Sequence, residues 1–145
     1  MSGTQKSEQI LTKALDTFES GYSCAETVLR VLQEAIPLEA DNLWHAASGF
    51  GGGIAGCGEV CGALSGAVMA LGFAEGQKRG RGGRLSDRVK SRVRTLHDEF
   101  LTEFGSVNCQ SLSGYLLRDQ EQYHAYKSGN AKRERCCRFV KFAVK

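Results

Sequence analysis

Residues 49–67 read GFGGGIAGCGEVCGALSGA and hold almost half of the chain's 18 glycines, together with Cys57 and Cys61. Glycine adopts backbone angles that are closed to other residues, so Gly49–Gly56 is expected to form a tight connection between two helices. Glycines also give close access to the backbone beside Cys61. The stretch therefore predicts a glycine-rich interhelical loop, and it is compatible with a site at its cysteines.

Three of these glycines also match a nucleotide-binding pattern. Gly51, Gly53 and Gly56 satisfy G-x-G-x-x-G, but this fingerprint indicates dinucleotide binding only directly after a strand, within a βαβ unit. A helical segment precedes it here, and the sequence holds no G-x-x-x-x-G-K-[ST]. No nucleotide cofactor is therefore expected.

The segment after the loop, Val60–Phe73, is apolar and is predicted to be a buried helix. Gly58, Gly62 and Gly66 recur there at every fourth residue. Small residues at this spacing let another helix approach closely. A polar loop over Glu75–Gly83 is expected to follow this helix.

The N-terminal part predicts two helices. The apolar stripe of the first consists of Leu11, Ala14, Leu15 and Phe18. Gly21 is expected to end this helix. Ser23 and Glu26 have the spacing of a capping box, which starts a second helix at Cys24. Pro37 is expected to stop that helix, because proline cannot continue it.

Further helices are predicted along the rest of the chain. The longest amphipathic one carries Leu85, Val89, Val93, Leu96, Phe100 and Phe104 at helical spacing. Asp41 is expected to cap a short helix before the glycine loop, and Asn108 to cap one that opens at Cys109. A polar region over Asp119–Asn130 precedes a last helix with Cys136 on its apolar face.

Length and patterning together indicate the fold class. A chain of 145 residues with 41% apolar residues is about one domain long and can bury its own core. No stretch alternates apolar and polar residues long enough to predict a strand. We therefore expect an all-α fold, a compact single-domain bundle of about five to six helices over residues 1–145.

The sequence also bears on location. The N-terminus MSGTQKSEQI lacks the apolar core of a secretory signal. No run approaches the ~20 apolar residues that span a bilayer, since the nearest, Val60–Ala74, has the length of a buried helix. A cytoplasmic protein without a membrane partner is expected.

Six cysteines are many for such a chain. Structural disulfides are rare inside cells, so the number favours metal ligation or redox chemistry. Four cysteines fall in four different predicted segments, each of which could direct one thiol inward: Cys24, Cys61, Cys109 and Cys136. We expect these four to converge on one site and regard Cys57 and Cys137 as accessory candidates.

The sequence resembles a known family at these cysteines. The segments GYSCAETVL, SGFGGGIAGCGEVCGALSGAVMALG, FGSVNCQSLSGY and CCRFV are similar, in this order, to the hallmark segments of the C-GCAxxG-C-C family of redox-active proteins. The family's cysteines fall on Cys24, Cys61, Cys109 and Cys136. Its members often have a proline where this chain has Cys137, and commonly another residue at the position of Cys57.

The resemblance implies redox chemistry at the four cysteines, by one of several routes. They would hold an iron–sulfur cluster for electron transfer, or cycle between dithiol and disulfide as a metal-free oxidoreductase or sensor. Dispersed inward thiols favour the cluster, because four thiolates are its usual ligands. Zinc is less favoured, since it usually binds paired C-x₂₋₄-C motifs. A third alternative is a structural or interaction protein with cysteines in its core, and enzymatic activity is left open.

The partners are predicted from the charges. The segment Lys78–Arg94 carries eight basic residues and one acid, which favours docking of an acidic redox partner protein. Nucleic acid is not the expected partner, because no aromatic residues are interleaved for base stacking. A homo-oligomer is left open.

Overall fold

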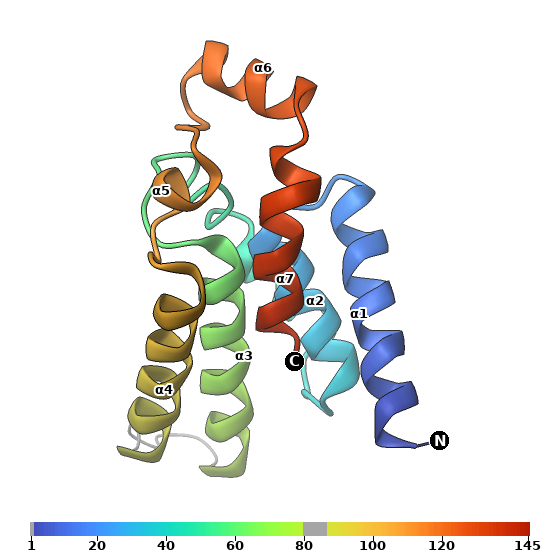
Figure 1. Cartoon of the computed structure of the whole chain (residues 1–145). Helices are drawn as coiled ribbons and strands as arrows, with labels where there is room; N and C mark the ends of the chain where they lie inside the picture. Colours follow the sequence, from blue (N-terminus) through green and yellow to red (C-terminus); the bar gives the residue numbers. More distant parts are fainter. Residues whose placement is uncertain (1, 80–86) are drawn as a thin grey trace.

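The structure is a computed structural model, and it describes residues 2–79 and 87–145. It confirms the all-α fold, with seven α-helices in the described residues and no strand there beyond an isolated bridge between Val60 and Asn108. The helices are α1 (Gly3–Glu19), α2 (Cys24–Ala35), α3 (Gly62–Arg79), α4 (Asp87–Phe104), α5 (Cys109–Ser113), α6 (Gln120–Ser128) and α7 (Cys137–Ala143). Figure 1 shows α6 lying across one end of the bundle that the longer helices form.

Capping residues determine where α2 begins, and a glycine follows the end of α1. Ser23 accepts a hydrogen bond from the backbone N–H of Glu26, and the Glu26 side chain accepts one from the backbone N–H of Ser23. This capping box starts α2 at Cys24, as predicted. Helix α1 ends at Glu19, two residues before Gly21, whose φ of +111° suits glycine.

The glycines of α3 let it pack closely against α2, as predicted. A Cβ atom added at Gly66 would lie 2.8 Å from the carbonyl oxygen of Ala25, and one at Gly62 would lie 2.5 Å from Cys24 Sγ. Any larger residue would therefore push the two helices apart. Gly58 does not belong to this contact, because α3 begins only at Gly62.

The polar loop predicted over Glu75–Gly83 is wrong in its first part. Helix α3 continues through Arg79, and Glu75 is buried in it at 5% exposure. Glu75 is tolerated there because Arg92 lies 3.1 Å from its carboxylate. The rest of the predicted loop and Leu85 of the predicted apolar stripe lie outside the described residues.

Helices α4 and α7 share an aromatic core. Phe100 is fully buried, and its ring centroid lies 4.8 Å from that of Phe104 in an edge-on arrangement. Phe104 and Phe139 are also edge-on at 4.8 Å. Such pairs add stability beyond the burial of their area. This core holds α7, and with it the segment before α7, in a fixed position.

Two elements at the C-terminal end were not predicted. Asp119 caps α6 through a hydrogen bond from the N–H of Gln122, so the polar region that precedes the predicted last helix contains a helix of its own. Residues Lys132–Cys136 form a π-helix that leads directly into α7. The π-helix lies at the N-terminal end of the predicted last helix, where it carries Cys136.

A 3₁₀-helix over Leu43–Ala47 replaces the short helix expected before the glycine loop. Asn42 rather than Asp41 is its N-cap residue, and no side chain caps it. The loop itself then turns through positive φ at Gly52 (66°) and Gly53 (69°) and at two residues that are not glycine, Ile54 (62°) and Ala55 (46°). The prediction of a tight connection is confirmed.

Backbone hydrogen bonds tie the glycine loop to a distant segment. The N–H of Cys61 donates to the carbonyl of Val107 at 2.7 Å, and the N–H of Cys109 donates to that of Glu59 at 2.7 Å. The N–H of Arg118 donates to the carbonyl of Gly56 at 3.0 Å. The loop and the segment around α5 thus form one layer at the end of the bundle.

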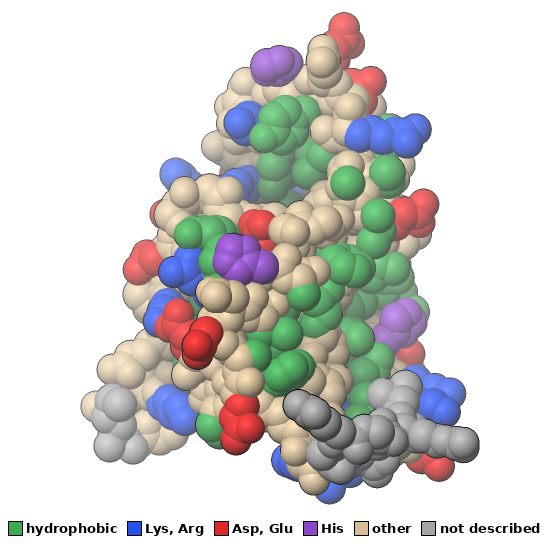
Figure 2. Space-filling model, turned by 180° about the vertical axis from the view of Figure 1, so that it is seen from behind, with side chains coloured by type: hydrophobic (Ala, Val, Ile, Leu, Met, Phe, Trp, Pro, Cys, Tyr) green, Lys and Arg blue, Asp and Glu red, His purple; other side chains and the backbone are tan. Residues whose placement is uncertain are grey.

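The surface includes exposed apolar side chains as well as charges. Figure 2 shows apolar side chains gathered along one face of the molecule. Ile54 is 42% exposed, Val60 40% and Leu101 41%. In the described residues, no helix combines the length and apolar character that a membrane crossing requires.

Candidate thiol site

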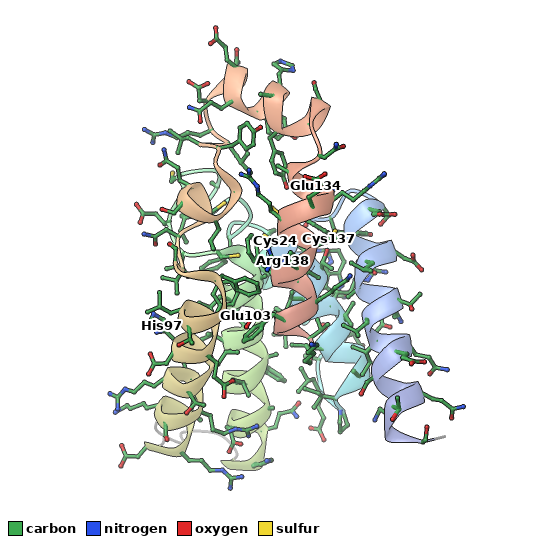
Figure 3. All side chains as sticks on the ribbon, viewed as in Figure 1. Cys24, His97, Glu103, Glu134, Cys137 and Arg138 are labelled. Carbon is green, nitrogen blue, oxygen red and sulfur yellow. The ribbon has the colours of Figure 1, made fainter. Side chains whose placement is uncertain are left out.

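One cavity collects the four cysteines that sequence analysis selected. It has a volume of about 740 Å³, and its walls include Cys24, Cys61, Cys109 and Cys136. Cys24 begins α2, Cys61 immediately precedes α3, Cys109 begins α5, and Cys136 ends the π-helix. Four segments therefore each direct one thiol to the same cavity. Figure 3 shows Cys24 in the middle of the molecule, between the end that carries α6 and the lower halves of the long helices.

Cys24 and Cys61 are neighbouring thiols that line this cavity, and each shifts the pKa of the other. Hydrogen bonding with the Cys61 thiol is the main cause that lowers the pKa of Cys24 to about 7, while burial acts in the opposite direction. Backbone hydrogen bonds at Gly52, Ala25 and Ala63 lower it further. These N–H groups lie at the beginnings of α2 and α3 and in the glycine loop, where free backbone donors are available. Cys24 is therefore the thiol of this site that ionises near neutral pH.

Cys61 has the opposite character. Its hydrogen bond to Cys24 raises its pKa well above the ordinary value, and burial adds to the effect. Its side chain is only 4% exposed. The pKa values of the two thiols thus shift in opposite directions, because Cys61 keeps its proton when Cys24 is ionised. Such a pair combines one nucleophilic thiolate with one protonated neighbour.

Cys109 lies at the start of α5 and is 8% exposed. Burial raises the pKa of Cys109 to about 11, the charge of Cys24 acts in the same direction, and a hydrogen bond with Ser113 opposes them. Asn108 precedes the helix as predicted, but its side chain makes no capping hydrogen bond. Cys109 is therefore a protonated thiol of the cavity wall at neutral pH.

Cys136 is held by a tyrosine that sequence analysis missed. The hydroxyl of Tyr126 donates a hydrogen bond to Cys136 Sγ at 3.4 Å. Burial raises the pKa of Cys136 to about 12, and the hydrogen bond from Tyr126 lowers it in part. Tyr126 comes from α6, and it is 8% exposed. No sequence signal could identify it, because α6 itself was not predicted.

The two accessory cysteines lie apart from the cavity walls. Cys57 is exposed in the glycine loop, with the guanidinium of Arg118 at 4.0 Å from its sulfur. Cys137 is 6% exposed and packs in the main hydrophobic core, and it does not line the cavity as Cys136 does. Burial raises the pKa of Cys137. Neither of these two cysteines therefore lines the cavity, whereas the other four do.

Two lysines at the same end of the molecule also border the cavity. Lys127 comes from α6, and Lys132 begins the π-helix. Lys132 Nζ lies 4.4 Å from the centroid of the Phe18 ring, and Lys127 Nζ lies 4.8 Å from that of Tyr123. Both are cation–π contacts. No histidine of the described residues lines the cavity, and Figure 3 shows His97 on α4, away from it.

The basic segment Lys78–Arg94 lies elsewhere, on α3 and α4, and part of it is outside the described residues. Three of its cations surround Glu75: Lys78 at 3.5 Å, Arg88 at 3.9 Å and Arg92 at 3.1 Å. These side chains compensate a buried carboxylate. Part of the positive charge of this segment is therefore neutralised by Glu75.

The four cysteines around the cavity can be compared with the ligand sets of an iron–sulfur cluster and of a single metal ion. Its four thiols match the number and type of the usual ligands of an iron–sulfur cluster. In the described part of the chain, no three Cys, His, Asp or Glu side chains are grouped closely enough to hold a metal ion.

Comparison with known proteins adds one finding. The family model described as "Putative redox-active protein (C_GCAxxG_C_C)" matches residues 22–145, and so includes all six cysteines. No curated protein and no solved structure matches the chain.

Proposed function

The chain belongs to the C_GCAxxG_C_C family, and on this basis we propose that Cys24 and Cys61 form a redox-active dithiol that cycles with a disulfide. The close approach of the two thiols within one cavity is the observation that carries the proposal. It brings together the two sulfur atoms that would form the bond. It also leaves Cys24 as the nucleophile and Cys61 as the thiol that resolves the intermediate.

The chemistry requires an oxidised partner with a disulfide bond. The Cys24 thiolate attacks one sulfur of this disulfide, forms a mixed disulfide, and releases the other sulfur as a thiolate. Cys61 then gives up its proton, attacks Cys24 Sγ, and releases the second half of the partner. Two electrons pass from the protein to the partner, which becomes two thiols. The reverse sequence reduces the protein again.

The neighbouring groups support this division of roles. A thiol with a pKa near ambient pH is close to the optimum for attack, since it is ionised without being a weak nucleophile. The pKa of Cys24 is about 7. Cys109 and Cys136 would be protonated under the same conditions, because burial raises their pKa values to about 11 and about 12. They would serve as walls of the cavity or as a second, slower pair.

The test is to oxidise the reduced protein with a mild disulfide and map the products by mass spectrometry. The expected product is a bond between Cys24 and Cys61, formed through a mixed disulfide on Cys24 that accumulates in Cys61→Ser. The matched control is Cys57→Ser, which should form the same product at the same rate. If the mixed disulfide forms on Cys61 in Cys24→Ser as fast as on Cys24 in the wild type, the assignment of roles is wrong.

An iron–sulfur cluster is the second candidate, because all four family cysteines line one cavity. Cys24, Cys61, Cys109 and Cys136 would be its ligands. Bound there, a cluster would supply one-electron transfer. The protein's own contribution would be four thiols and the partly apolar walls of the cavity, which control access of water.

Anaerobic purification separates the two candidates. A visible absorption band with iron and sulfide in near-stoichiometric amounts would support the cluster, and Cys109→Ser would then abolish both. A colourless, iron-free protein after attempted reconstitution would contradict it. Under the dithiol proposal, Cys109→Ser keeps the oxidation of Cys24 and Cys61 intact, so this variant distinguishes the two.

A further inference from the structure

The walls of the cysteine cavity contain charges that the dithiol chemistry does not use. Glu26 is the acidic residue of the wall, and its carboxylate is already engaged by the backbone N–H of Ser23 at 2.9 Å. Lys127 and Lys132 also border the cavity. Among the described residues, neither lysine ammonium lies within ion-pair distance of a carboxylate. The cavity therefore offers positive charge to a ligand.

Each lysine is held in place by an aromatic ring. Lys132 is half-buried and lies over Phe18 of α1, and Lys127 lies over Tyr123 one turn earlier in α6. A cation over a ring keeps its charge while its position is restricted. Because both lysines line the cavity, a carboxylate bound there could contact their side chains.

The size and depth of the cavity limit what can reach the sulfur atoms. A volume of about 740 Å³ is within the range of small-molecule sites. Cys24 is half-buried, and Cys61 and Cys109 are only 4% and 8% exposed, so a substrate must enter the cavity to reach the sulfur atoms. Phe18, Leu112 and Phe139 give the cavity apolar walls. Such a space suits a small molecule.

We propose that the cavity binds a small disulfide that carries carboxylate groups, with Lys127 and Lys132 binding the carboxylates while its sulfur atoms face Cys24. This inference rests on the dithiol function proposed above and names its substrate class. Cys24 bonds to one substrate sulfur, and the substrate S–S bond breaks with release of a thiolate. Cys61 then displaces the second substrate sulfur. The substrate disulfide is reduced to two thiols, and the protein dithiol is oxidised to one disulfide.

The experiment compares disulfide probes of different charge on the reduced full-length protein. Oxidised glutathione is anionic and carries carboxylates, 2-hydroxyethyl disulfide is neutral, and cystamine is cationic. Each rate of formation of the Cys24–Cys61 bond is divided by the rate at which dithiothreitol reacts with the same probe. After this normalisation we expect oxidised glutathione to react about tenfold faster than the neutral probe, and cystamine to be the slowest. High salt should reduce the difference.

The lysine variants test the subsite. Lys127→Gln and Lys132→Gln should each slow the reaction with oxidised glutathione about three- to fivefold. They should leave the rate with 2-hydroxyethyl disulfide, and alkylation of Cys24 by neutral iodoacetamide, unchanged. Lys90→Gln on α4 is the matched control, because Lys90 borders no part of this cavity, and it should change none of these rates.

The possible negative results distinguish a wrong substrate assignment from a wrong dithiol function. Equal normalised rates for the anionic and neutral probes, or lysine variants that behave like Lys90→Gln, would overturn the substrate assignment and leave the dithiol function standing. Faster normalised oxidation by the disulfides of insulin than by oxidised glutathione would identify a protein substrate, and the assignment would be wrong. If no probe produces a Cys24–Cys61 bond, the dithiol function fails and the substrate assignment fails with it.

Discussion

The sulfur of Cys24 lies 2.5 Å from the point that a Cβ atom on Gly62 would occupy. The first residue of α2 and the first residue of α3 thus meet with no space between them for a side chain. Cys61, whose thiol shifts the pKa of Cys24, immediately precedes Gly62. The closest contact between the two helices is therefore also the contact that positions the two thiols.

Gly62→Ala should disturb both stability and reactivity. The added methyl group would overlap with Cys24 Sγ and would lie 3.0 Å from the carbonyl oxygen of Phe50. We expect a loss of about 1–3 kcal/mol in the free energy of unfolding, measured by chemical denaturation, and a changed alkylation rate of Cys24. Gly72→Ala is the control in the same helix, since nothing lies within 4 Å of its added Cβ. It should gain up to ~1 kcal/mol from helix propensity.

The reactivity of Cys24 should depend on pH with a midpoint near 7. Its pKa is lowered to about 7, and the thiolate is the reactive form, so the rate of alkylation by iodoacetamide should rise through pH 7 and level off above it. Cys61→Ala removes the hydrogen bond that lowers this pKa, so the curve should shift to higher pH. Mass spectrometry after timed alkylation resolves each cysteine. A midpoint near the ordinary value of 9.0 in the wild type would contradict this assignment.

Tyr126→Phe should weaken the attachment of α6 to the cavity. The variant keeps the ring, which packs edge-on against Tyr115 with centroids 5.9 Å apart, but loses the hydrogen bond to Cys136. We expect a loss of about 0.5–1.5 kcal/mol in unfolding free energy and a higher pKa of Cys136, seen as slower alkylation at alkaline pH. Tyr123→Phe, at a position 40% exposed, is the control. Equal effects of the two substitutions would argue against a role for the Tyr126 hydroxyl.

Glu75→Gln should lower stability in a way that depends on pH. Burial would raise the pKa of Glu75, but Lys78 and Arg88 outweigh it and hold the pKa below its ordinary value of 4.5. A lowered pKa stabilises the folded state above 4.5, and this contribution is lost as the pH falls through the folded-state value. The variant should therefore melt below the wild type at pH 7, and the difference should shrink as the pH falls below 4.5. Thermal melts across this range, with exposed Glu103→Gln as control, provide the measurement.

Much of the fold could be predicted because its signals are local. The capping box of Ser23 and Glu26 lies within four residues and predicts the start of α2 correctly. The glycine spacing in α3 predicts close packing, because a missing side chain has the same consequence in any tertiary context. These signals also place Cys24 at a helix N-terminus without knowledge of the remaining chain.

Features that depend on contacts distant in sequence were missed. In the sequence, Glu75 resembles a loop residue. In the structure it is part of α3, because Arg92 of α4 compensates its charge. Helix α6 has a polar sequence, so periodicity could not indicate it, although Asp119 is a good N-cap residue. The thiol pair of Cys24 and Cys61 likewise depends on how two helix starts meet. The four cysteines could be selected from the sequence, but their division into an ionisable thiol and protonated neighbours could not.

The hydrogen bonds between the glycine loop and the segment around α5 also constrain the order of folding. The partners of Gly56, Glu59 and Cys61 are Arg118, Cys109 and Val107, which leave the ribosome much later. The thiol pocket therefore cannot close during early synthesis, when α1 to α3 can already associate. Cys24 and Cys61 of the nascent chain must therefore stay exposed to solvent until residues 107–118 have been synthesised. Because these bonds join segments far apart in the chain, amide hydrogen exchange should also find late protection at Cys61 and Cys109 during refolding, after protection has developed within α2.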